Sequence, residues 1–93
     1  MVKVKLNLLN IFQLKTDKKS IEYEGKTVGD VITQFINEHM NELGDEMLSK
    51  NKKKFNSQIL ILLNGRNIKY LKGFRTKLED SDELYLSFAL AGG

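Results

Sequence analysis

The sequence predicts an α+β domain in which a mixed β-sheet of four to five strands packs on one main helix. Residues 2–9 alternate between apolar and polar side chains, which is typical of a half-buried strand. In residues 27–40 the apolar side chains recur every three or four positions and predict an amphipathic helix. Residues 58–63 form a continuous apolar run between turn signals, which indicates a central strand. A sheet and a helix of this kind bury their apolar faces in one shared core.

Length and composition fit one domain. The 93 residues, of which 41% are hydrophobic, suffice for a modest core, and we expect one domain over residues 1–93 with a flexible tail at 90–93. The chain has no cysteine, which excludes disulfides, thiolate zinc sites and cysteine nucleophiles. No stretch is long enough to cross a membrane, and the N-terminal segment alternates instead of forming the apolar core of a signal peptide. We therefore expect a cytoplasmic protein.

The N-terminal part predicts a β-hairpin. The strand at residues 2–9 is followed by a polar turn at 15–19. Residues 20–25, with the sequence SIEYEG, alternate again and predict a second short strand that pairs with the first.

The helix that follows has clear start and stop signals. Thr27 is a good N-cap, and Asp30 three residues later completes a capping box. Gly44 is a plausible C-cap. Phe35 lies in the middle of the apolar stripe, so we expect its side chain to be buried against the sheet. The whole stripe consists of Val28, Val31, Ile32, Phe35 and Ile36.

The C-terminal part predicts three more strands. After the apolar strand at 58–63, the sequence NGR at 64–66 is a strong signal for a chain reversal. A short strand is expected at 67–71, a surface segment at 72–83 and a final strand at 83–90. We expect the first and last strands to be central in the sheet.

No group of residues in the sequence predicts catalysis or metal binding. His39 is the only histidine, and we expect it at the surface or near the C-terminal end of the helix, without a metal. The lysines at 52–54 predict a solvated loop, since no aromatic residue is interleaved with them. A tight turn is the expected role of the carboxylates Glu79, Asp80, Asp82 and Glu83.

The apolar strand at 58–63 also predicts a partner surface, because one helix can cover only one of its two faces. An apolar patch on an open sheet is typical of an interaction site, with self-association as the alternative. We expect the outward patch to consist of Leu60, Leu62, Tyr85 and Ser87, with Lys3 and Lys5 at its rim. In the alternative register the outward residues are Ile59, Ile61 and Leu63.

Residues 59–93 resemble the C-terminal half of the ubiquitin-like, β-grasp sulfur carriers. This family includes the molybdopterin synthase small subunit, its archaeal modifier relatives and the eukaryotic ubiquitin-related modifier. The matching features are the apolar strand into NGR, the L-x-D-x-D turn, the apolar last strand and the diglycine, at Leu78, Asp80, Asp82, Gly92 and Gly93. The segments VKVKL and TVGDVI are also similar to the family.

Two departures from the family pattern bear on the pathway. Molybdopterin-type carriers often have a glycine where Ser81 stands and a pair of prolines shortly before the diglycine, whereas this chain has no proline. The tail LSFALAGG is more similar to the ubiquitin-related modifier, which favours tRNA thiolation or protein conjugation. The similarity to ubiquitin, whose corresponding strand shows an outward aliphatic residue two positions before its turn, also supports Leu60 and Leu62 as the outward pair.

The resemblance implies a β-grasp carrier or modifier that is not itself an enzyme. An ATP-dependent activating enzyme would adenylate the carboxyl of Gly93, and sulfur would displace AMP to leave a thiocarboxylate. The sulfur would serve tRNA thiolation or molybdopterin synthesis, and conjugation to lysines of target proteins is a further option. Partner contacts would extend to Leu90 and Ala91 in front of Gly92.

The partners expected from this resemblance are the activating enzyme and a sulfur-accepting enzyme or target protein. No cofactor is expected on the chain, since the enzyme uses the ATP, and neither a membrane nor direct nucleic-acid binding is expected. The net charge of +3 permits contact with nucleic acid without indicating it. The alternatives are a non-conjugated β-grasp interaction module and a β-grasp RNA-binding module.

Overall fold

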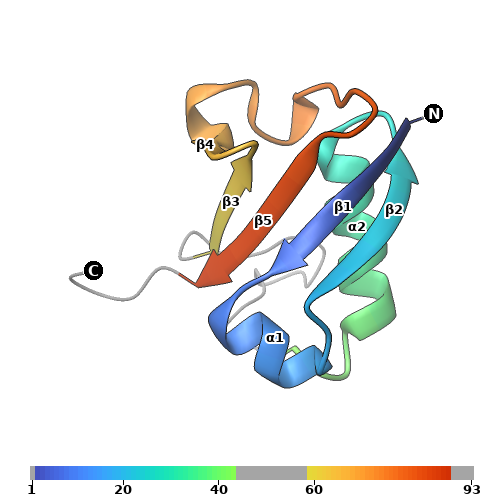
Figure 1. The fold of residues 1–93 in the computed structure, drawn as a ribbon, viewed down its shortest axis with the longest axis vertical. Helices are drawn as coiled ribbons and strands as arrows, with labels where there is room; N and C mark the ends of the chain where they lie inside the picture. Colours follow the sequence, from blue (N-terminus) through green and yellow to red (C-terminus); the bar gives the residue numbers. More distant parts are fainter. Residues whose placement is uncertain (1, 44–58, 89–93) are drawn as a thin grey trace.

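A computed structural model describes residues 2–43 and 59–88 and confirms the α+β class (Figure 1). In chain order its elements are β1 (Val2–Leu8), α1 (Asn10–Thr16), β2 (Ser20–Gly25), α2 (Val28–His39), β3 (Ile59–Leu63), β4 (Arg66–Asn67), the 3-10 helices η1 (Ile68–Tyr70) and η2 (Gly73–Arg75), and β5 (Glu83–Phe88). The strands form one sheet in the order β2-β1-β5-β3-β4. Helix α2 lies across one face of this sheet (Figure 1).

The sheet is mixed, as expected, and the two ends of the sequence meet inside it. β1 pairs with β2 antiparallel and with β5 parallel, while β5 pairs with β3 antiparallel. The predicted hairpin of the first two strands is therefore confirmed. The first and last strands are interior strands, also as predicted, and β5 occupies the middle position of the sheet.

The capping box of α2 is formed as predicted. The Thr27 side chain accepts a hydrogen bond from the Asp30 amide at 3.3 Å, and the Asp30 carboxylate accepts one from the Thr27 amide at 3.1 Å. The same carboxylate also accepts from the Lys26 amide at 2.8 Å. The helix ends at His39 with Met40 as its C-cap, and the predicted C-cap at Gly44 lies outside the described residues.

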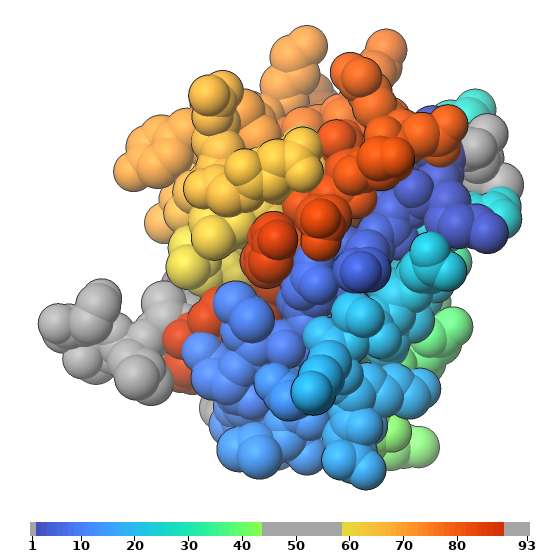
Figure 2. Space-filling model, in the orientation of Figure 1, coloured from blue at the N-terminus to red at the C-terminus, as the bar shows by residue number. Residues whose placement is uncertain are grey.

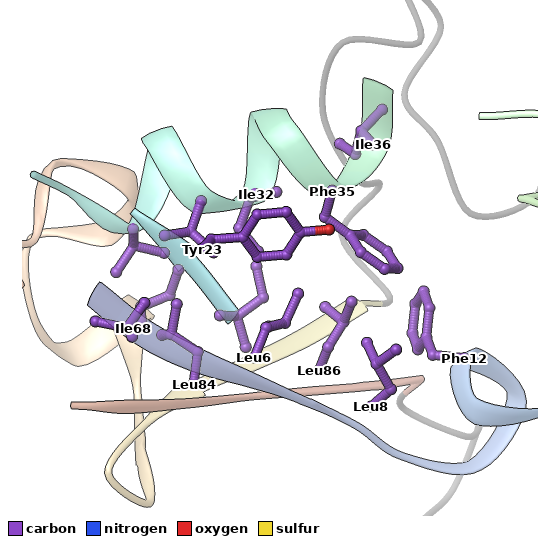
Figure 3. Packing of buried hydrophobic residues seen from close by; sticks show 14 of the residues in the cluster. Leu6, Leu8, Phe12, Tyr23, Ile32, Phe35, Ile36, Ile68, Leu84 and Leu86 are labelled. Carbon is purple, nitrogen blue, oxygen red and sulfur yellow. The ribbon is translucent and has the colours of Figure 1, made fainter. Parts of the chain in front are cut away.

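The predicted stripe of α2 is buried against side chains from β1 and β5. Phe35 has an exposed fraction of 0%, and its ring meets that of Phe12 edge to face at a centroid distance of 6.3 Å. Figure 3 shows this pair beside Leu8 and Leu86 from the sheet. The core cluster includes Val4, Leu6, Leu8, Phe12, Val28, Val31, Ile32, Phe35, Ile36, Ile61, Leu84 and Leu86.

The Tyr23 side chain connects β2 to Glu38, an exposed residue of α2. Its ring is part of the core (Figure 3), and its hydroxyl donates a hydrogen bond to Glu38 at 2.8 Å. Burial raises the pKa of Tyr23 well above its usual value, and the bond to Glu38 raises it further. The phenol therefore stays protonated and remains a donor over the ordinary pH range.

Helix α1 was not predicted from the sequence. The sequence predicts a strand up to residue 9 and a polar turn at 15–19, whereas residues 10–16 form two turns of helix that bury Phe12 completely. The Thr16 hydroxyl donates to the Phe12 carbonyl at 2.8 Å and closes the helix locally. A helix this short shows too few apolar repeats to be seen in the pattern, so its packing on the core decides its formation.

The strand predicted at 67–71 is wrong in extent. β4 has only two residues, and Ile68–Tyr70 forms the 3-10 helix η1. The Asn67 side chain accepts from the Lys69 amide at 2.9 Å, which starts this turn, and Ile68 is buried beneath it. The reversal at 64–66 is confirmed, since Asn64 and Gly65 have φ values of 51° and 90°, as a type I′ hairpin turn requires.

His39 is at the end of α2 as expected, but it is not at the surface. Its exposed fraction is 5%, and its ring packs on Phe35 with a centroid distance of 4.7 Å. The ring Nδ1 lies 3.3 Å from the Phe35 carbonyl oxygen. Because His39 follows Phe35 by four residues and Ile36 by three, it continues the buried stripe by one more turn.

We expect Phe35→Ala to lower the free energy of unfolding by about 3–5 kcal/mol, because it removes a fully buried ring from a packed core. Denaturant unfolding measures this value. The matched control is Leu14→Ala in α1, whose side chain is 82% exposed and whose loss should change stability by less than about 0.5 kcal/mol. A loss below about 1 kcal/mol for Phe35→Ala would contradict this placement of the helix.

We also expect the capping box to contribute stability that depends on pH. The amide hydrogen bonds from Lys26, and then from Thr27, lower the pKa of Asp30. The contribution is therefore complete above the unfolded pKa of about 3.9 and is lost as the pH falls through the lower folded value. Asp30→Ala should cost about 1 kcal/mol at neutral pH.

Denaturant unfolding of the wild type and Asp30→Ala should show this difference shrinking below about pH 4. A difference between the two proteins that stays constant down to acid pH would show that the ionised carboxylate is not what caps the helix.

Candidate partner-binding surface

The candidate site in the described part of the chain is a surface of the sheet. Among residues 2–43 and 59–88 there is no group of three or more His, Cys, Asp or Glu side chains that could hold a metal ion. Within the same ranges, no helix has the length and apolar character needed to cross a membrane. The feature to be explained is therefore the face of the sheet that α2 does not cover.

The pairing of β3 with β5 places the predicted patch on this outer face. Leu62 lies opposite Tyr85 and Leu60 lies opposite Ser87, and side chains paired in this way share one face of a sheet. All four side chains are half-buried. We call Leu60, Leu62, Tyr85 and Ser87 the outer patch.

The alternative register does not occur. Ile61 is buried, with an exposed fraction of 4%, and Ile59 and Leu63 pack against the core. Leu84 and Leu86, which alternate with the outer residues of β5, are fully buried. Alternation along a strand therefore assigns the core to one face and the outer patch to the other.

The lysines predicted at the rim lie on β1, the strand next to β5. Lys5 is the partner of Glu83 on one side and of Glu22 on the other, whereas Asn7 is the partner of Tyr85. The outer face is thus apolar over β3 and β5 and charged over β1 and β2. Figure 2 shows the side chains of these strands running side by side across this face.

A shallow depression marks the charged half of the outer face. It is lined by Lys3, Val4, Lys5, Glu22, Asp80, Ser81, Asp82 and Glu83. Lysines and carboxylates both line it, so this half of the face can make polar contacts of both charges but has no strong electrostatic potential of one sign. The rim of the outer patch is therefore mixed in charge instead of basic.

Asn7 is a residue of this face that the sequence pattern did not single out. Its side-chain amide donates to the Glu83 carboxylate at 3.2 Å and to the Leu84 carbonyl at 3.1 Å. These bonds tie β1 to the start of β5 directly beside Tyr85. Its polar position in an alternating strand was the only sequence signal, and that signal is common to all solvent-facing strand residues.

The turn before β5 holds the outer patch in register. As expected for a tight turn, the Asp82 carboxylate accepts from the Glu79 amide at 2.8 Å. It also accepts from the Asn64 side chain at 2.9 Å, and the Asn64 side-chain oxygen accepts from the Glu83 amide at 2.9 Å. The β3–β4 turn and the turn before β5 are therefore bonded to each other, which fixes β3 against β5.

Ser81 adopts a left-handed backbone conformation in this turn, with a φ of 73°. Glycine reaches this conformation without the clash that a Cβ introduces, whereas serine accepts some strain there. The turn itself therefore demands left-handed backbone at position 81.

The end of β5 connects this surface to the predicted activation site. β5 is described as far as Phe88, which pairs with Ile59 of β3. Leu90, Ala91, Gly92 and Gly93 lie outside the described residues. The outer patch is therefore carried by the same strand that leads into the diglycine.

No protein-family model matches the chain, and no curated protein matches it by sequence. Solved structures do match over nearly the full length. Small archaeal modifier protein 1 from Methanosarcina acetivorans is 29% identical, with a TM-score of 0.80 and coverage of 100% of this chain and 98% of that one. The structure of a BexX/CysO complex from Amycolatopsis orientalis matches at 26% identity and a TM-score of 0.75, covering 97% and 99%.

A third structure, Urm1 from Trypanosoma brucei, shares the fold at 16% identity and a TM-score of 0.76, covering 98% of this chain and 95% of that one. All three are small proteins of the β-grasp type, and they agree with the mixed sheet and the covering helix described above. The chain therefore has the ubiquitin-like β-grasp fold, and the solved structures that it resembles include a small archaeal modifier protein and a BexX/CysO complex.

Proposed function

We propose that the chain is a sulfur carrier or protein modifier whose C-terminal glycine is activated by a partner enzyme. The observation that carries this proposal is the position of the diglycine, which follows the central strand β5 of a β-grasp fold after a few residues. The chain supplies a reachable carboxylate, and the partner supplies the catalytic groups and the ATP site. The protein is then a substrate of an enzyme, binds no cofactor of its own and works in the cytoplasm.

The proposed reaction has two steps. A carboxylate oxygen of Gly93 attacks the α-phosphorus of ATP, which forms an acyl adenylate and releases pyrophosphate. Hydrosulfide then attacks the carbonyl carbon and expels AMP, which leaves a thiocarboxylate and releases one proton. Activation is needed because a free carboxylate is a poor electrophile.

Glycine suits the last two positions because the tail must enter an active site. Without a Cβ, Gly92 and Gly93 can pass in extended form through a channel that larger side chains would block. The five residues after Phe88 can reach at most about 17 Å when fully extended. The reacting carboxyl can therefore enter the partner enzyme while β5 stays within the sheet.

The outer patch is the proposed docking surface for this enzyme. Leu60, Leu62 and Tyr85 present two aliphatic side chains and one aromatic ring beside the strand that carries the tail, and Ser87 adds a hydroxyl. Buried apolar and aromatic anchors usually supply most of the affinity of an interface. Leu90 and Ala91 would continue this contact toward the diglycine.

For the sulfur acceptor we favour tRNA thiolation or conjugation to target lysines over molybdopterin synthesis. The tail has no proline before the diglycine, and Ser81 stands where molybdopterin-type carriers often have glycine. Both features are closer to the ubiquitin-related modifier than to the molybdopterin synthase small subunit.

An RNA-binding module is the second candidate, and one observation favours it. Residues 66–77 carry five basic side chains and no acidic one, namely Arg66, Lys69, Lys72, Arg75 and Lys77, all of them exposed. Tyr70 among them is 82% exposed, and an exposed aromatic ring beside cations can stack on a base. Such a module would lose RNA affinity steeply as salt rises, and it would not need Gly93.

We expect deletion of Gly93, or extension of the chain beyond it, to abolish activation and leave the fold intact. The reason is that the deletion places the terminal carboxylate one residue short of the ATP phosphate in the partner, whereas the extension removes the free carboxylate from Gly93. Intact-mass measurement after incubation with ATP, sulfide and the activating enzyme should show replacement of one oxygen by sulfur in the wild type only. If the wild type never changes in mass, the proposal fails and the non-conjugated interaction module remains as the alternative. Adenylation of a tail-extended protein would overturn the proposal as well.

We expect Leu62→Arg to weaken binding of the activating enzyme by about 2 kcal/mol or more, as loss of an interface anchor does. Stability should change by less than about 0.5–1 kcal/mol, because Leu62 faces outward on the sheet. Binding is measured by calorimetry and stability by denaturant unfolding.

Ile61→Arg is the matched control on the same strand. Because Ile61 is buried, the charged side chain should unfold the protein or destabilise it by more than about 3 kcal/mol. If Leu62→Arg binds the enzyme as tightly as the wild type does, the outer patch is not the docking surface.

A further inference from the structure

The geometry points to Asn10 as a positioning residue that fixes the end of β5, from which the C-terminal residues continue. This inference rests on the proposed function and adds a residue far from the diglycine in sequence. Asn10 stands where β1 leaves the sheet and α1 begins, directly beside the last residues of β5. It contacts Ser87 and Phe88 across 77 and 78 positions of the chain.

The end of β5 extends past its neighbour β1. The last paired residues of the parallel ladder are Leu8 and Leu86, and the Leu9 amide adds one more bond to the Leu86 carbonyl at 3.0 Å. Backbone groups alternate between the two sides of a strand, so the Phe88 amide points to the same side as the Leu86 carbonyl. β1 has no further strand residue to offer there, because α1 has begun.

The side chain of Asn10 takes the place of the missing strand residue. Its carboxamide oxygen accepts from the Phe88 amide at 3.3 Å and from the Ile11 amide at 2.8 Å. Its nitrogen donates to the Ser87 hydroxyl at 2.8 Å. Since both backbone amides can only donate, the oxygen must face them, and the orientation of the carboxamide is settled by its partners.

The backbone of Asn10 is adapted to this role. Its φ is 40°, a left-handed conformation that asparagine tolerates better than most residues because its short side chain bonds to nearby backbone. The sharp change of direction lets α1 start while the side chain points back at β5. One residue therefore ends β1, begins α1 and holds the last two described residues of β5.

Fixing this end of the strand lowers the conformational entropy that is lost when the partner enzyme binds the chain. Each backbone residue that must be ordered when the tail enters an enzyme costs conformational entropy. Ser87 and Phe88 are already ordered by Asn10 on one side and by β3 on the other. These two residues therefore add no further ordering cost when a partner engages the chain. Asn10 acts through the position of β5 and has no part in the chemical step.

The test compares three variants of the full chain. Asn10→Gly removes the side chain but keeps the left-handed backbone accessible, so it deletes the contact with little added strain. Asn10→Asp keeps an oxygen for both amides, and its second oxygen can accept from the Ser87 hydroxyl, so it should restore the contact. Ser87→Ala removes only the hydroxyl bond and leaves the bond to Phe88.

Amide hydrogen exchange measured by NMR reports on the hydrogen bond between Asn10 and Phe88 independently of any reaction. In Asn10→Gly the Phe88 amide should exchange about tenfold faster or more, because its bond is lost and the strand end opens locally. Amides of the β1–β2 hairpin serve as internal controls and should keep their rates. Asn10→Asp should exchange like the wild type.

The rate of activation by the partner enzyme measures whether loss of this contact affects the reaction at the C-terminus. In Asn10→Gly kcat/KM for adenylate formation should fall about fivefold, the size expected from loss of the Phe88 amide bond, mainly through a higher KM. Asn10→Asp should restore it, whereas a purely structural defect would appear as a lower unfolding midpoint.

The two readouts separate this inference from the proposed function. Unchanged Phe88 exchange in Asn10→Gly overturns the inference, as does faster exchange with no change in kcat/KM. If the wild type is never activated, the proposed function fails, and Phe88 exchange alone then decides whether Asn10 orders the strand end.

Discussion

The parallel pairing of β1 with β5 is the constraint on which the rest of the structure depends. It joins strands from the two ends of the sequence, from Lys5 with Glu83 to Leu8 with Leu86, and makes both of them interior strands. β2 and β3 then have an edge to pair with, and the buried faces of β1 and β5 form the floor on which α2 packs. The strand that leads into the C-terminal residues is therefore the middle strand of the sheet and is paired on both sides.

Alternate residues of β5 face the core and the outer face of the sheet. Leu84 and Leu86 point into the core, whereas Tyr85 and Ser87 point to the outer face. A partner can therefore contact the outer face without disturbing the core, because neighbouring residues on a strand point in opposite directions.

Asparagine side chains hold both ends of this central strand. At its start the Asn64 side chain accepts from the Glu83 amide, and at its end the Asn10 side chain accepts from the Phe88 amide. Both residues have left-handed backbones, with φ values of 51° and 40°, so each changes the chain direction while bonding to β5. Short carboxamides suit this task, since they accept from a strand and tolerate the turn that brings them beside it.

Sequence alone determined those features that depend on local pattern. The 3.6-residue stripe and the capping box at Thr27 and Asp30 placed α2, and the alternation in β1 and β5 separated core from surface. Asn64 and Gly65 specified the reversal after β3, because few other pairs adopt positive φ at both positions. The resemblance of residues 59–93 to a carrier family supplied the functional expectation.

Only the tertiary structure decided the features that depend on contacts between distant segments. Helix α1 forms because Phe12 packs against the ring of Phe35. A seven-residue segment is too short for its own periodicity to predict such a helix. His39 is buried because α2 packs one turn further than its aliphatic residues suggest. The mixed charge beside the outer patch and the hydrogen bond between Asn10 and Phe88 both follow from the β1–β5 register. This register joins residues almost eighty positions apart, so the sequence of either segment alone does not predict it.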